Sequence, residues 1–344
     1  MTKLTMTLAA AFTTAALSLP AAAQTFDLQS AYGPAVPGSG PAASAWAKKV
    51  ERGTNGALRF TVHGAGGIVP PLEVFGAVSS GAIPFGYDWA GYWGDQIPVA
   101  ALLGGMPFGP NPEQYTAWLY NGGGLGLMRN IMAKHNVHVI PCQMVLQEAA
   151  GWFNKEIKTV ADLKGLNMRF AGIGAQVLGK LGVNTQLIPA GEIYVSLERG
   201  RIDATEFSSP GLDVGLGFQN VAKYYYFPGW HQPSSVNSII VHLPIWNKLS
   251  ADQKQTMEDA CKANILEITA EQVHAQIDAL NVIEKAGVQV RMLPEEVLKA
   301  IKTATDELMA ERSAADPQFK KVYQSLNNYI KRTDRWYRLQ DLPR

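Results

Sequence analysis

Few residue patterns in this chain could support covalent or metal-assisted catalysis. The serine-nucleophile pattern G-x-S-x-G and the zinc-protease pattern H-E-x-x-H are both absent from the 344 residues. Of the six histidines, only His135 and His138 stand close together, at the start of a strand-like segment. A surface or core position is far commoner for such a pair than a metal site. The sequence therefore favours a binding protein over an enzyme.

Two further features resemble chemical motifs only superficially. The run GGGLGL at residues 122–127 lacks the lysine of a phosphate-binding loop and follows no convincing strand, so we expect a plain loop there. Cys142 and Cys261 are the only cysteines, and neither has a C-x-x-C context. They could pair in an oxidising compartment, but their wide separation says little about it. The default expectation is that both are small buried apolar residues.

The N-terminal residues predict export. Lys3 is followed by an uncharged apolar or small stretch, 4–19, then Pro20 and three alanines at 21–23. This order is typical of a signal peptide with a small-residue cleavage site. The stretch is short for a bilayer span, which needs about 20 apolar residues. We therefore expect a signal peptide over 1–23 and a mature periplasmic protein that begins at Gln24.

Composition narrows the class of partner. The formal net charge is +1 and the basic residues are scattered along the chain. Nucleic acids and anionic membrane surfaces are therefore not expected partners. The length is sufficient for two domains, since single domains cluster near 100–200 residues.

Strand-like and helix-like segments alternate up to about residue 241. The expected strands are 26–31, 58–62, 83–86, 137–143, 167–170, 185–188, 202–207 and 236–241, and the expected helices are 42–52, 71–79, 160–164, 175–181 and 193–198. The last three helices end at Gly165, Gly182 and Gly200, a residue type that adopts the left-handed C-cap conformation at little cost. This alternation predicts an α/β protein with open, mostly parallel sheets.

The C-terminal third is helical in character. Ser250 and Gln253 form a capping box that opens a helix without Gly or Pro up to Ala286. At about 1.5 Å per residue this helix is roughly 50 Å long, enough to span two lobes. Further helices are expected over 293–310 and 318–342. The aromatic apolar side chains of the last one could pack on their own lobe or on a partner subunit.

These patterns predict two lobes with a cleft between them. Lobe I comprises 24–147 plus 235–270, lobe II comprises 148–234, and 271–344 is a helical region that packs on both lobes or dimerises. A cleft between lobes is where ligands bind in proteins that close by hinge motion.

Five segments together resemble the solute-binding subunit of tripartite ATP-independent periplasmic (TRAP) transporters. They are GWFNKEI (151–157), DLKGLNMR (162–169), GEIYVSLERG (191–200), IDATE (202–206) and VAKYYYFPGW (221–230). The resemblance covers nearly the whole mature chain. Within the family, the chain is more specifically similar to the branch that includes 2-oxo-acid, lactate, chloroaromatic and sugar-acid binders. It implies a two-lobed periplasmic receptor that delivers a small organic acid to separate membrane subunits.

The resemblance assigns the carboxylate contact to Arg169. In the family an arginine at this position forms a bidentate salt bridge with the substrate, because a planar guanidinium matches two carboxylate oxygens. The alternative is that Arg169 pairs with an internal acid.

The resemblance also implies a cation that bridges substrate and protein. The matching ligand positions are Gln147 or Glu148, Glu206 with the backbone carbonyl of Phe207, and His231 or Gln232. Oxygen ligands of this kind suit Na⁺ or Ca²⁺.

At three of these positions the chain departs from the family pattern. Glu148 stands where Gln is usual, Phe207 where Trp is usual, and Gln232 where an acid is usual. One carboxylate is lost and another gained, so a cation site is retained as a hypothesis. The alternative is direct hydrogen bonding to a larger hydroxylated or aromatic acid.

The remaining ligand contacts are expected from aromatic and amide side chains. Of the aromatic residues at 87–93, Tyr92 is the first choice and Trp89 the second, and about half of this group is expected to be core packing. Asn154 of the GWFN segment is a further candidate.

The favoured ligand is a 2-oxo or 2-hydroxy monocarboxylate such as pyruvate or lactate. Aromatic or sugar-derived acids bound without metal are the first alternative, and a periplasmic enzyme is a remote one. The C-terminal helix could also be exchanged between two copies, as in some relatives.

Overall fold

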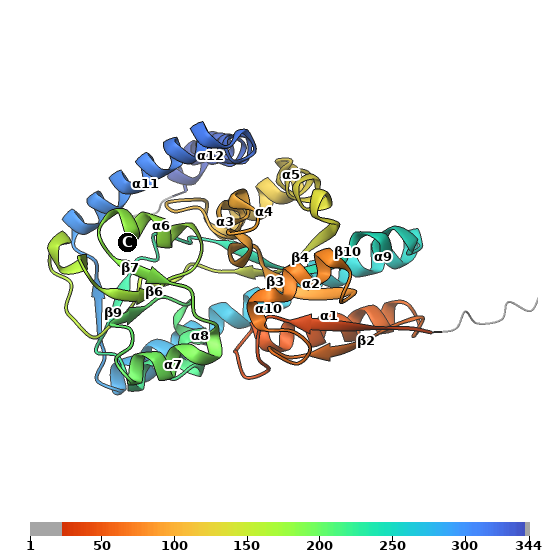
Figure 1. Ribbon diagram of the computed structural model, residues 1–344, viewed down its shortest axis with the longest axis horizontal. Coiled ribbons are helices and arrows are strands. Elements are labelled where there is room, and N and C mark those ends of the chain that lie inside the picture. The colour runs from red at the N-terminus through yellow and green to blue at the C-terminus, as the bar shows by residue number, and fades with distance from the viewer. Residues whose placement is uncertain (1–22, 341–344) are drawn as a thin grey trace, which may run out of the picture.

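The computed structural model describes residues 23–340 and places them in two α/β lobes (Figure 1). Lobe I is built on a five-stranded sheet of order β2-β1-β3-β10-β4. Its strands are β1 (Gln24–Ser30), β2 (Leu58–His63), β3 (Phe85–Trp89), β4 (Val137–Val145) and β10 (Ser235–His242). Lobe II is built on a six-stranded sheet of order β11-β9-β5-β8-β6-β7. Its strands are β5 (Gly151–Phe153), β6 (Asn167–Arg169), β7 (Asn184–Gln186), β8 (Ala204–Thr205), β9 (Tyr224–Phe227) and β11 (Gln289–Met292).

The prediction of mostly parallel sheets is only partly right. β10 runs antiparallel to both β3 and β4, and β5 runs antiparallel to both β8 and β9. Each of these two strands is the first after the chain has crossed from the other lobe. A strand that arrives by such a crossing is not constrained by the helical crossover that keeps consecutive strands parallel.

Helices cover the sheet of lobe I. They are α1 (Ser39–Gly53), η1 (Pro71–Glu73), α2 (Val74–Ser80), η2 (Ala90–Trp93), α3 (Pro98–Gly104), α4 (Pro112–Asn121), α5 (Gly124–Met132), η3 (Ala133–His135) and α9 (Leu243–Lys248). The prediction of a plain loop over 122–127 is wrong, because α5 begins at Gly124. A Cβ on Gly124 would lie 2.5 Å from the ring of Trp118 in α4. That glycine permits close helix packing and does not end a helix.

In lobe II the predicted glycine stops are confirmed. The helices are η4 (Val160–Leu163), α6 (Gly172–Lys180), α7 (Ala190–Glu198), α8 (Pro210–Gly215) and η5 (Phe218–Asn220). Gly165, Gly182 and Gly200 follow η4, α6 and α7 with φ of 77°, 84° and 65°. The strand expected over 202–207 is shorter than predicted and is reduced to β8.

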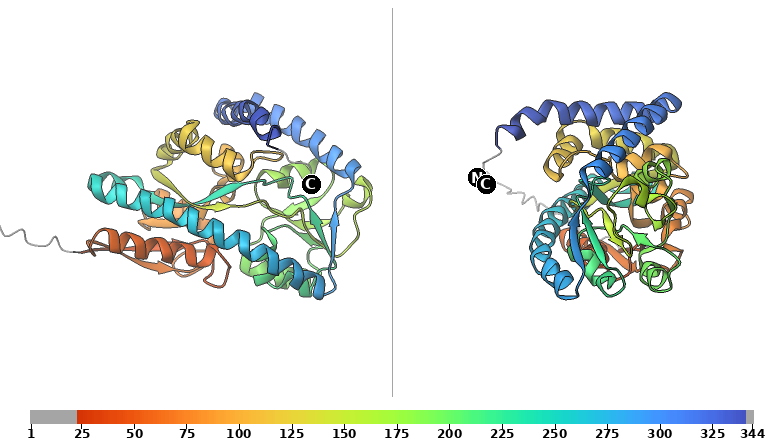
Figure 2. Two further views of the ribbon diagram at one scale, coloured as in Figure 1. Left: turned by 180° about the vertical axis from the view of Figure 1, so that it is seen from behind. Right: turned by 90° about the vertical axis from the view of Figure 1, so that its left-hand side faces the viewer.

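The chain crosses between the lobes at four places: residues 146–150, residues 228–234, the 35-residue helix α10 (Ala251–Lys285), and the return between the last two helices near the C-terminus. Seen from behind, α10 runs diagonally across the whole molecule (Figure 2). It packs on α1 and β4 in lobe I and on α8 and β11 at the other end, so the predicted span of both lobes is confirmed. The helical character expected for 271–344 is interrupted by β11, which pairs with β9.

The two C-terminal helices return the chain from lobe II to lobe I. α11 (Glu295–Ala315) packs on α6, and α12 (Pro317–Arg338) packs on α3, α4 and α5. Trp118 of α4 donates a 3.1 Å hydrogen bond to Ser325 Oγ of α12. The first half of α12 thus packs on its own chain, whereas Trp336 and Leu339 at its end are 56% and 72% exposed.

A disulfide joins Cys142 of β4 to Cys261 of α10. The default expectation of two unpaired cysteines is therefore wrong. The residues are 119 positions apart, and only the packing of α10 on β4 brings them together.

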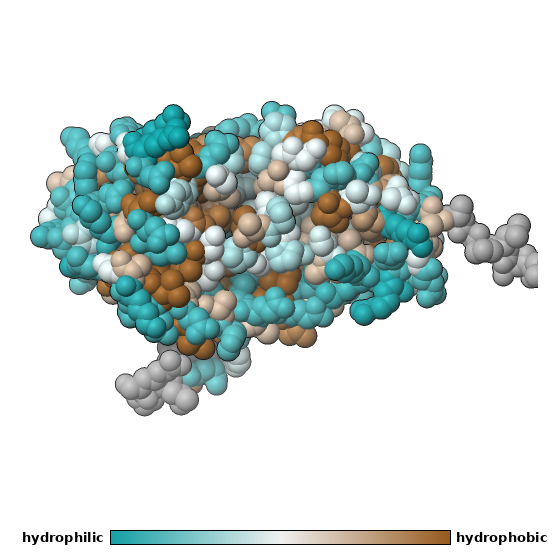
Figure 3. Space-filling view, turned by 90° about the horizontal axis from the view of Figure 1, so that it is seen from below, coloured by the Kyte–Doolittle hydropathy of each residue, from teal (hydrophilic) through white to brown (hydrophobic). Residues whose placement is uncertain are grey.

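None of the helices within residues 23–340 is long and apolar enough to cross a membrane. Residues 1–22 of the expected signal peptide lie outside the described part of the chain. On the face seen from below, polar and apolar side chains alternate in small patches (Figure 3), in keeping with the scattered charges of the sequence.

Candidate ligand-binding site

A cavity lies between the two lobes and is lined by side chains from both. It holds about 380 Å³ of empty space, part of it continuous with solvent. Its lining combines aromatic walls with buried charged and amide groups: Tyr32, Ser39, Trp89, Tyr92, Val145 and Asn237 from lobe I, Glu148 and Gln232 from the crossings, and Arg169, Ala171, Glu206, Phe207, Ser208 and Leu212 from lobe II. Such a mixture is typical of a site for a small polar ligand.

Arg169 and Glu206 form the centre of the lobe II wall. Arg169 ends β6 and Glu206 follows β8, and these strands are adjacent and parallel, so both side chains emerge at the same sheet edge. Arg169 Nη1 donates to Glu206 Oε2 at 2.6 Å, and Nε donates to the Ile188 carbonyl at 3.2 Å. The two side chains are 1% and 2% exposed. The internal pairing that we considered as an alternative for Arg169 therefore exists.

This pairing leaves part of the guanidinium available. Within residues 23–340, Arg169 Nη2 makes no hydrogen bond, and the side chain lines the cavity. Glu206 is also held by the backbone N–H of Ala171, at 3.2 Å. The acid and the Ile188 carbonyl thus orient the guanidinium, and Nη2 is the one nitrogen left to donate to a second anion.

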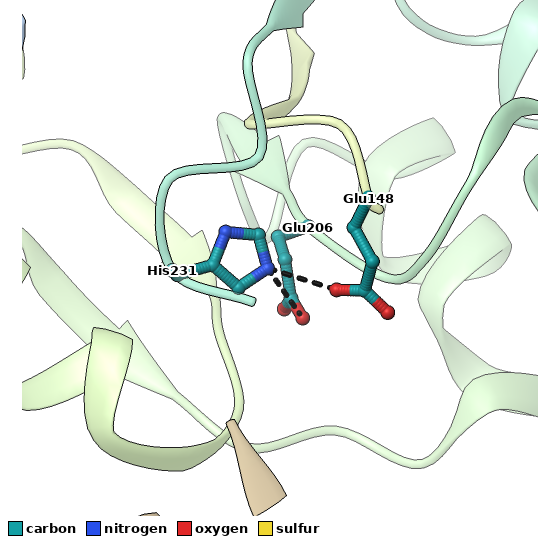
Figure 4. A group of neighbouring side chains, drawn as sticks. All are labelled: Glu148, Glu206 and His231. Carbon is teal, nitrogen blue, oxygen red and sulfur yellow. Dashed lines mark hydrogen bonds and ion pairs between the residues drawn. The ribbon is translucent and has the colours of Figure 1, made fainter. Parts of the chain in front are cut away.

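The two non-helical crossings bring further polar groups to the same place. Glu148 lies in the first crossing and His231 in the second (Figure 4). Gln232 follows His231 in the second crossing. His231 Nε2 is 2.9 Å from Glu148 Oε2 and 3.5 Å from Glu206 Oε1. Gln232 Nε2 donates to Glu148 Oε1 at 2.7 Å. The two positions at which the carboxylate is exchanged relative to the family pattern are therefore direct neighbours.

The close approach of the crossings depends on Gly229. A Cβ on this residue would lie 2.1 Å from the carbonyl oxygen of Glu148, so no other residue type fits. The Pro-Gly-Trp segment therefore sets the distance between Glu148 and His231.

The electrostatics of this cluster are dominated by burial. Burial raises the pKa of Glu148, and the hydrogen bond to His231 only partly opposes this. Burial by itself lowers the pKa of His231, but the hydrogen bonds and charges of Glu148 and Glu206 outweigh it and raise that pKa. The imidazole is thus held in its charged form between two acids.

The donor set is suited to a cation. One ligand atom from each of Glu148, Glu206 and His231 lies within 4.8 Å of the others, and all three residues are buried. A charged His231 has no free lone pair, so in that state the ligand atoms are the carboxylate oxygens of Glu148 and Glu206. Two converging carboxylates with a neighbouring amide match the ligand preference of Na⁺ or Ca²⁺.

Most predicted site residues meet at this cavity. Arg169, Trp89, Tyr92, Glu148, Glu206, Phe207 and Gln232 all line it. Gln147 and Asn154 do not line it. Gln147 is exposed, because its neighbour Glu148 points inward. Asn154 follows β5, and its backbone N–H donates to the Asp203 carbonyl. Within the aromatic group, Tyr87 and Trp93 are core residues that do not reach the cavity.

Sequence reasoning missed three polar side chains in the lobe I wall, Tyr32, Ser39 and Asn237. Tyr32 follows β1, and its hydroxyl donates to Asn237 Oδ1 at 3.0 Å. Asn237 Nδ2 in turn contacts Ser39 Oγ at 3.3 Å. Tyr32 could have been found from its place just beyond a strand end, and Asn237 as the one amide within the buried strand β10.

Comparison with known proteins agrees with this architecture. Residues 35–316 match the family described as bacterial extracellular solute-binding protein, family 7 (DctP). A monocarboxylate 2-oxoacid-binding periplasmic protein of Nostoc sp. is 36% identical over 296 residues, which are 86% of this chain and 81% of that protein.

Solved structures of TRAP solute-binding proteins superpose closely. The protein of Bordetella bronchiseptica has a TM-score of 0.90 at 32% identity, covering 92% of this chain and 95% of that one. It is a mixed-occupancy dimer with copurified calcium and picolinate in one site. That of Colwellia psychrerythraea, with bound calcium and pyruvate, has a TM-score of 0.89 at 34% identity, covering 93% and 98%. That of Pseudoalteromonas atlantica, with sodium and pyruvate, has a TM-score of 0.89 at 32% identity, covering 93% and 97%.

The resemblance inferred from the five segments, the two-lobed fold and the periplasmic location are thereby confirmed. The chain belongs to the family 7 bacterial extracellular solute-binding proteins, the extracytoplasmic receptors of TRAP transporters.

Proposed function

We propose that this receptor binds a small monocarboxylate, a 2-oxo or 2-hydroxy acid such as pyruvate or lactate, in the cavity between its lobes. The observation that carries the proposal is the buried Arg169, which lines the cavity and whose Nη1 and Nε are occupied by the protein while Nη2 has no partner among the described residues. A carboxylate would complete the guanidinium with charge-assisted hydrogen bonds. The pyruvate-bound and 2-oxoacid-binding relatives support the same class of ligand.

A Na⁺ or Ca²⁺ ion would bridge this acid to the protein. Glu206, the Phe207 carbonyl and Gln232 are its proposed ligands, with Glu148 beside them. An added carboxylate would bring a third negative charge to a cluster in which Arg169 and the charged His231 already balance Glu148 and Glu206, and a cation would offset that added charge while polarising the 2-oxo or 2-hydroxy oxygen. The calcium or sodium in the three relatives supports this assignment.

An aromatic acid is the second candidate ligand. The aromatic side chains of Tyr92 and Phe207 line the cavity, and the Bordetella relative holds picolinate. A flat ring acid would use the same Arg169 contact and gain apolar burial against these walls. A sugar-derived acid without metal remains the further alternative. In each case the ligand leaves unchanged, because the receptor binds and releases it without catalysis.

The partners follow from the family. The receptor would deliver its acid to the TRAP membrane subunits, and a second copy would contact the exposed end of α12. Light scattering tests the second point: Trp336→Glu together with Leu339→Glu should convert a dimer to a monomer. A wild-type chain that is monomeric at all concentrations would exclude this dimer.

Mass spectrometry of acids released from gently purified protein identifies the ligand directly. Calorimetry then tests the role of Arg169. We expect Arg169→Ala and Arg169→Lys each to weaken pyruvate binding by about 30-fold or more, since truncating a buried charge pair costs about 2–5 kcal/mol. Thermal unfolding of both variants checks that the fold persists. Wild-type affinity in a folded Arg169→Ala would overturn the proposal.

A further inference from the structure

A second, outer chamber adjoins the ligand cavity. It holds about 660 Å³ of empty space, against about 380 Å³ for the inner cavity by the same measure, both including space open to solvent. Its walls come from η2 and the turn after it in lobe I, and from α6 and the residues around β7 in lobe II. Among the described residues, only Tyr92 and Ala171 line both chambers.

Tyr92 and Ala171 form the partition between the chambers from opposite lobes. The backbone N–H of Ala171 is fixed by Glu206 Oε2 at 3.2 Å, and its side chain is a single methyl group. The phenol ring of Tyr92 therefore supplies most of the partition. Because the two residues come from different lobes, the partition is complete only when the lobes are together.

The ring of Tyr92 is held by other aromatic groups. It meets Trp89 edge to face, with ring centroids 5.0 Å apart and planes at 82°. The Tyr32 ring lies 6.4 Å away on centroids. Trp89 is itself fixed, since its Nε1 donates to the Gly104 carbonyl at 2.9 Å. A ring with such neighbours behaves as a rigid wall, because turning it would lose these aromatic contacts.

We propose that Tyr92 sets the maximum length of the acid that this receptor accepts. The inference rests on the proposed function, in which the carboxylate lies on Arg169. With the carboxylate there, the ring of Tyr92 closes the inner cavity behind a short acid. A longer chain would have to pass the ring into the outer chamber, where Gln176, Thr185 and Gln186 present polar groups.

Three variants separate this role from general packing. Tyr92→Ala removes the wall and joins the two chambers, whereas Tyr92→Phe keeps the ring and loses only the hydroxyl. Gln186→Ala alters the outer chamber without touching the partition. Tyr92→Leu offers an intermediate wall if the alanine variant does not fold, which thermal unfolding would show.

Calorimetry with pyruvate, 2-oxobutyrate and 2-oxohexanoate tests the proposal. In the wild type and in Tyr92→Phe and Gln186→Ala, we expect affinity to fall by about tenfold or more from pyruvate to 2-oxohexanoate. In Tyr92→Ala or Tyr92→Leu the ratio should approach one or reverse, because each methylene buried in the joined chambers favours binding by about fourfold.

Two outcomes would overturn the inference. One is a folded Tyr92→Ala that binds pyruvate and rejects 2-oxohexanoate as strongly as the wild type. The other is a wild type that binds both acids equally. If neither the wild type nor Tyr92→Phe binds any monocarboxylate, the proposed function fails as well, and the pyruvate measurement distinguishes that case from the first two.

Discussion

Removing the disulfide between Cys142 and Cys261 should cost much stability and little affinity. The bond closes a loop of 119 residues between β4 and α10. In the chain-entropy treatment, a cross-link over a loop of this length lowers the entropy of the unfolded chain by about 16 cal/mol/K, or about 5 kcal/mol at room temperature. We expect the double variant Cys142→Ala and Cys261→Ala to lose about this much free energy of unfolding. Neither cysteine lines the ligand cavity, so ligand affinity should change by less than about twofold.

Urea unfolding followed by tryptophan fluorescence measures this loss. The oxidised wild type, the wild type in excess reductant and the double variant are compared in the same buffer. The two forms without the bond should agree within about 1 kcal/mol, which shows that the lost bond and not the lost side-chain packing is responsible. A double variant that unfolds within about 1 kcal/mol of the oxidised wild type would refute the reasoning.

Three further predictions concern the site and its surroundings. In buffer free of sodium and calcium and containing EDTA, pyruvate affinity should fall and should return on addition of Ca²⁺ or Na⁺; unchanged affinity would remove the cation. Glu206→Gln should reduce the gain in pyruvate affinity on adding the cation by about tenfold, which corresponds to about 1.4 kcal/mol. Glu192→Gln on the exposed helix α7 should leave that gain unchanged, and calorimetry compares the two variants. Burial raises the pKa of Asp88 from 3.8 to about 7, so the folded chain keeps a proton that the unfolded chain has lost and stability falls as pH rises from about 4 to about 7. Asp88→Asn should flatten this fall in unfolding experiments, and an unchanged slope would contradict it.

The sequence predicted those site residues that a local motif positions. Arg169 and Glu206 were found because each ends or follows a strand within a family segment, and adjacent parallel strands bring them together. Glu148 and Gln147 could not be separated, because the chain between β4 and β5 is irregular and no periodicity says which side chain points inward. Asn237 was missed because only the antiparallel insertion of β10 between β3 and β4 places it at the cavity.

In lobe II the helices were predicted where a glycine follows them, whereas α5 was missed because its first residue is a glycine. Gly165, Gly182 and Gly200 behave as helix stops. Gly124 belongs inside α5 because of the ring of Trp118, a contact between two helices that sequence spacing does not reveal. The disulfide was unpredictable for the same reason, since it depends on the packing of α10 on β4.

The first three crossings have a mechanical consequence for how the receptor opens. Glu148 and Gln232 lie in different crossings and are joined by a hydrogen bond, and Gly229 keeps these segments in contact. The third crossing is a continuous helix, which resists torsion. We therefore expect the lobes to separate by rotation about a single axis through the paired segments, with little twist. Since the same residues line the ligand cavity, we expect ligand binding and lobe opening to be coupled, and a change at residue 148 or 232 should alter ligand release and lobe opening together.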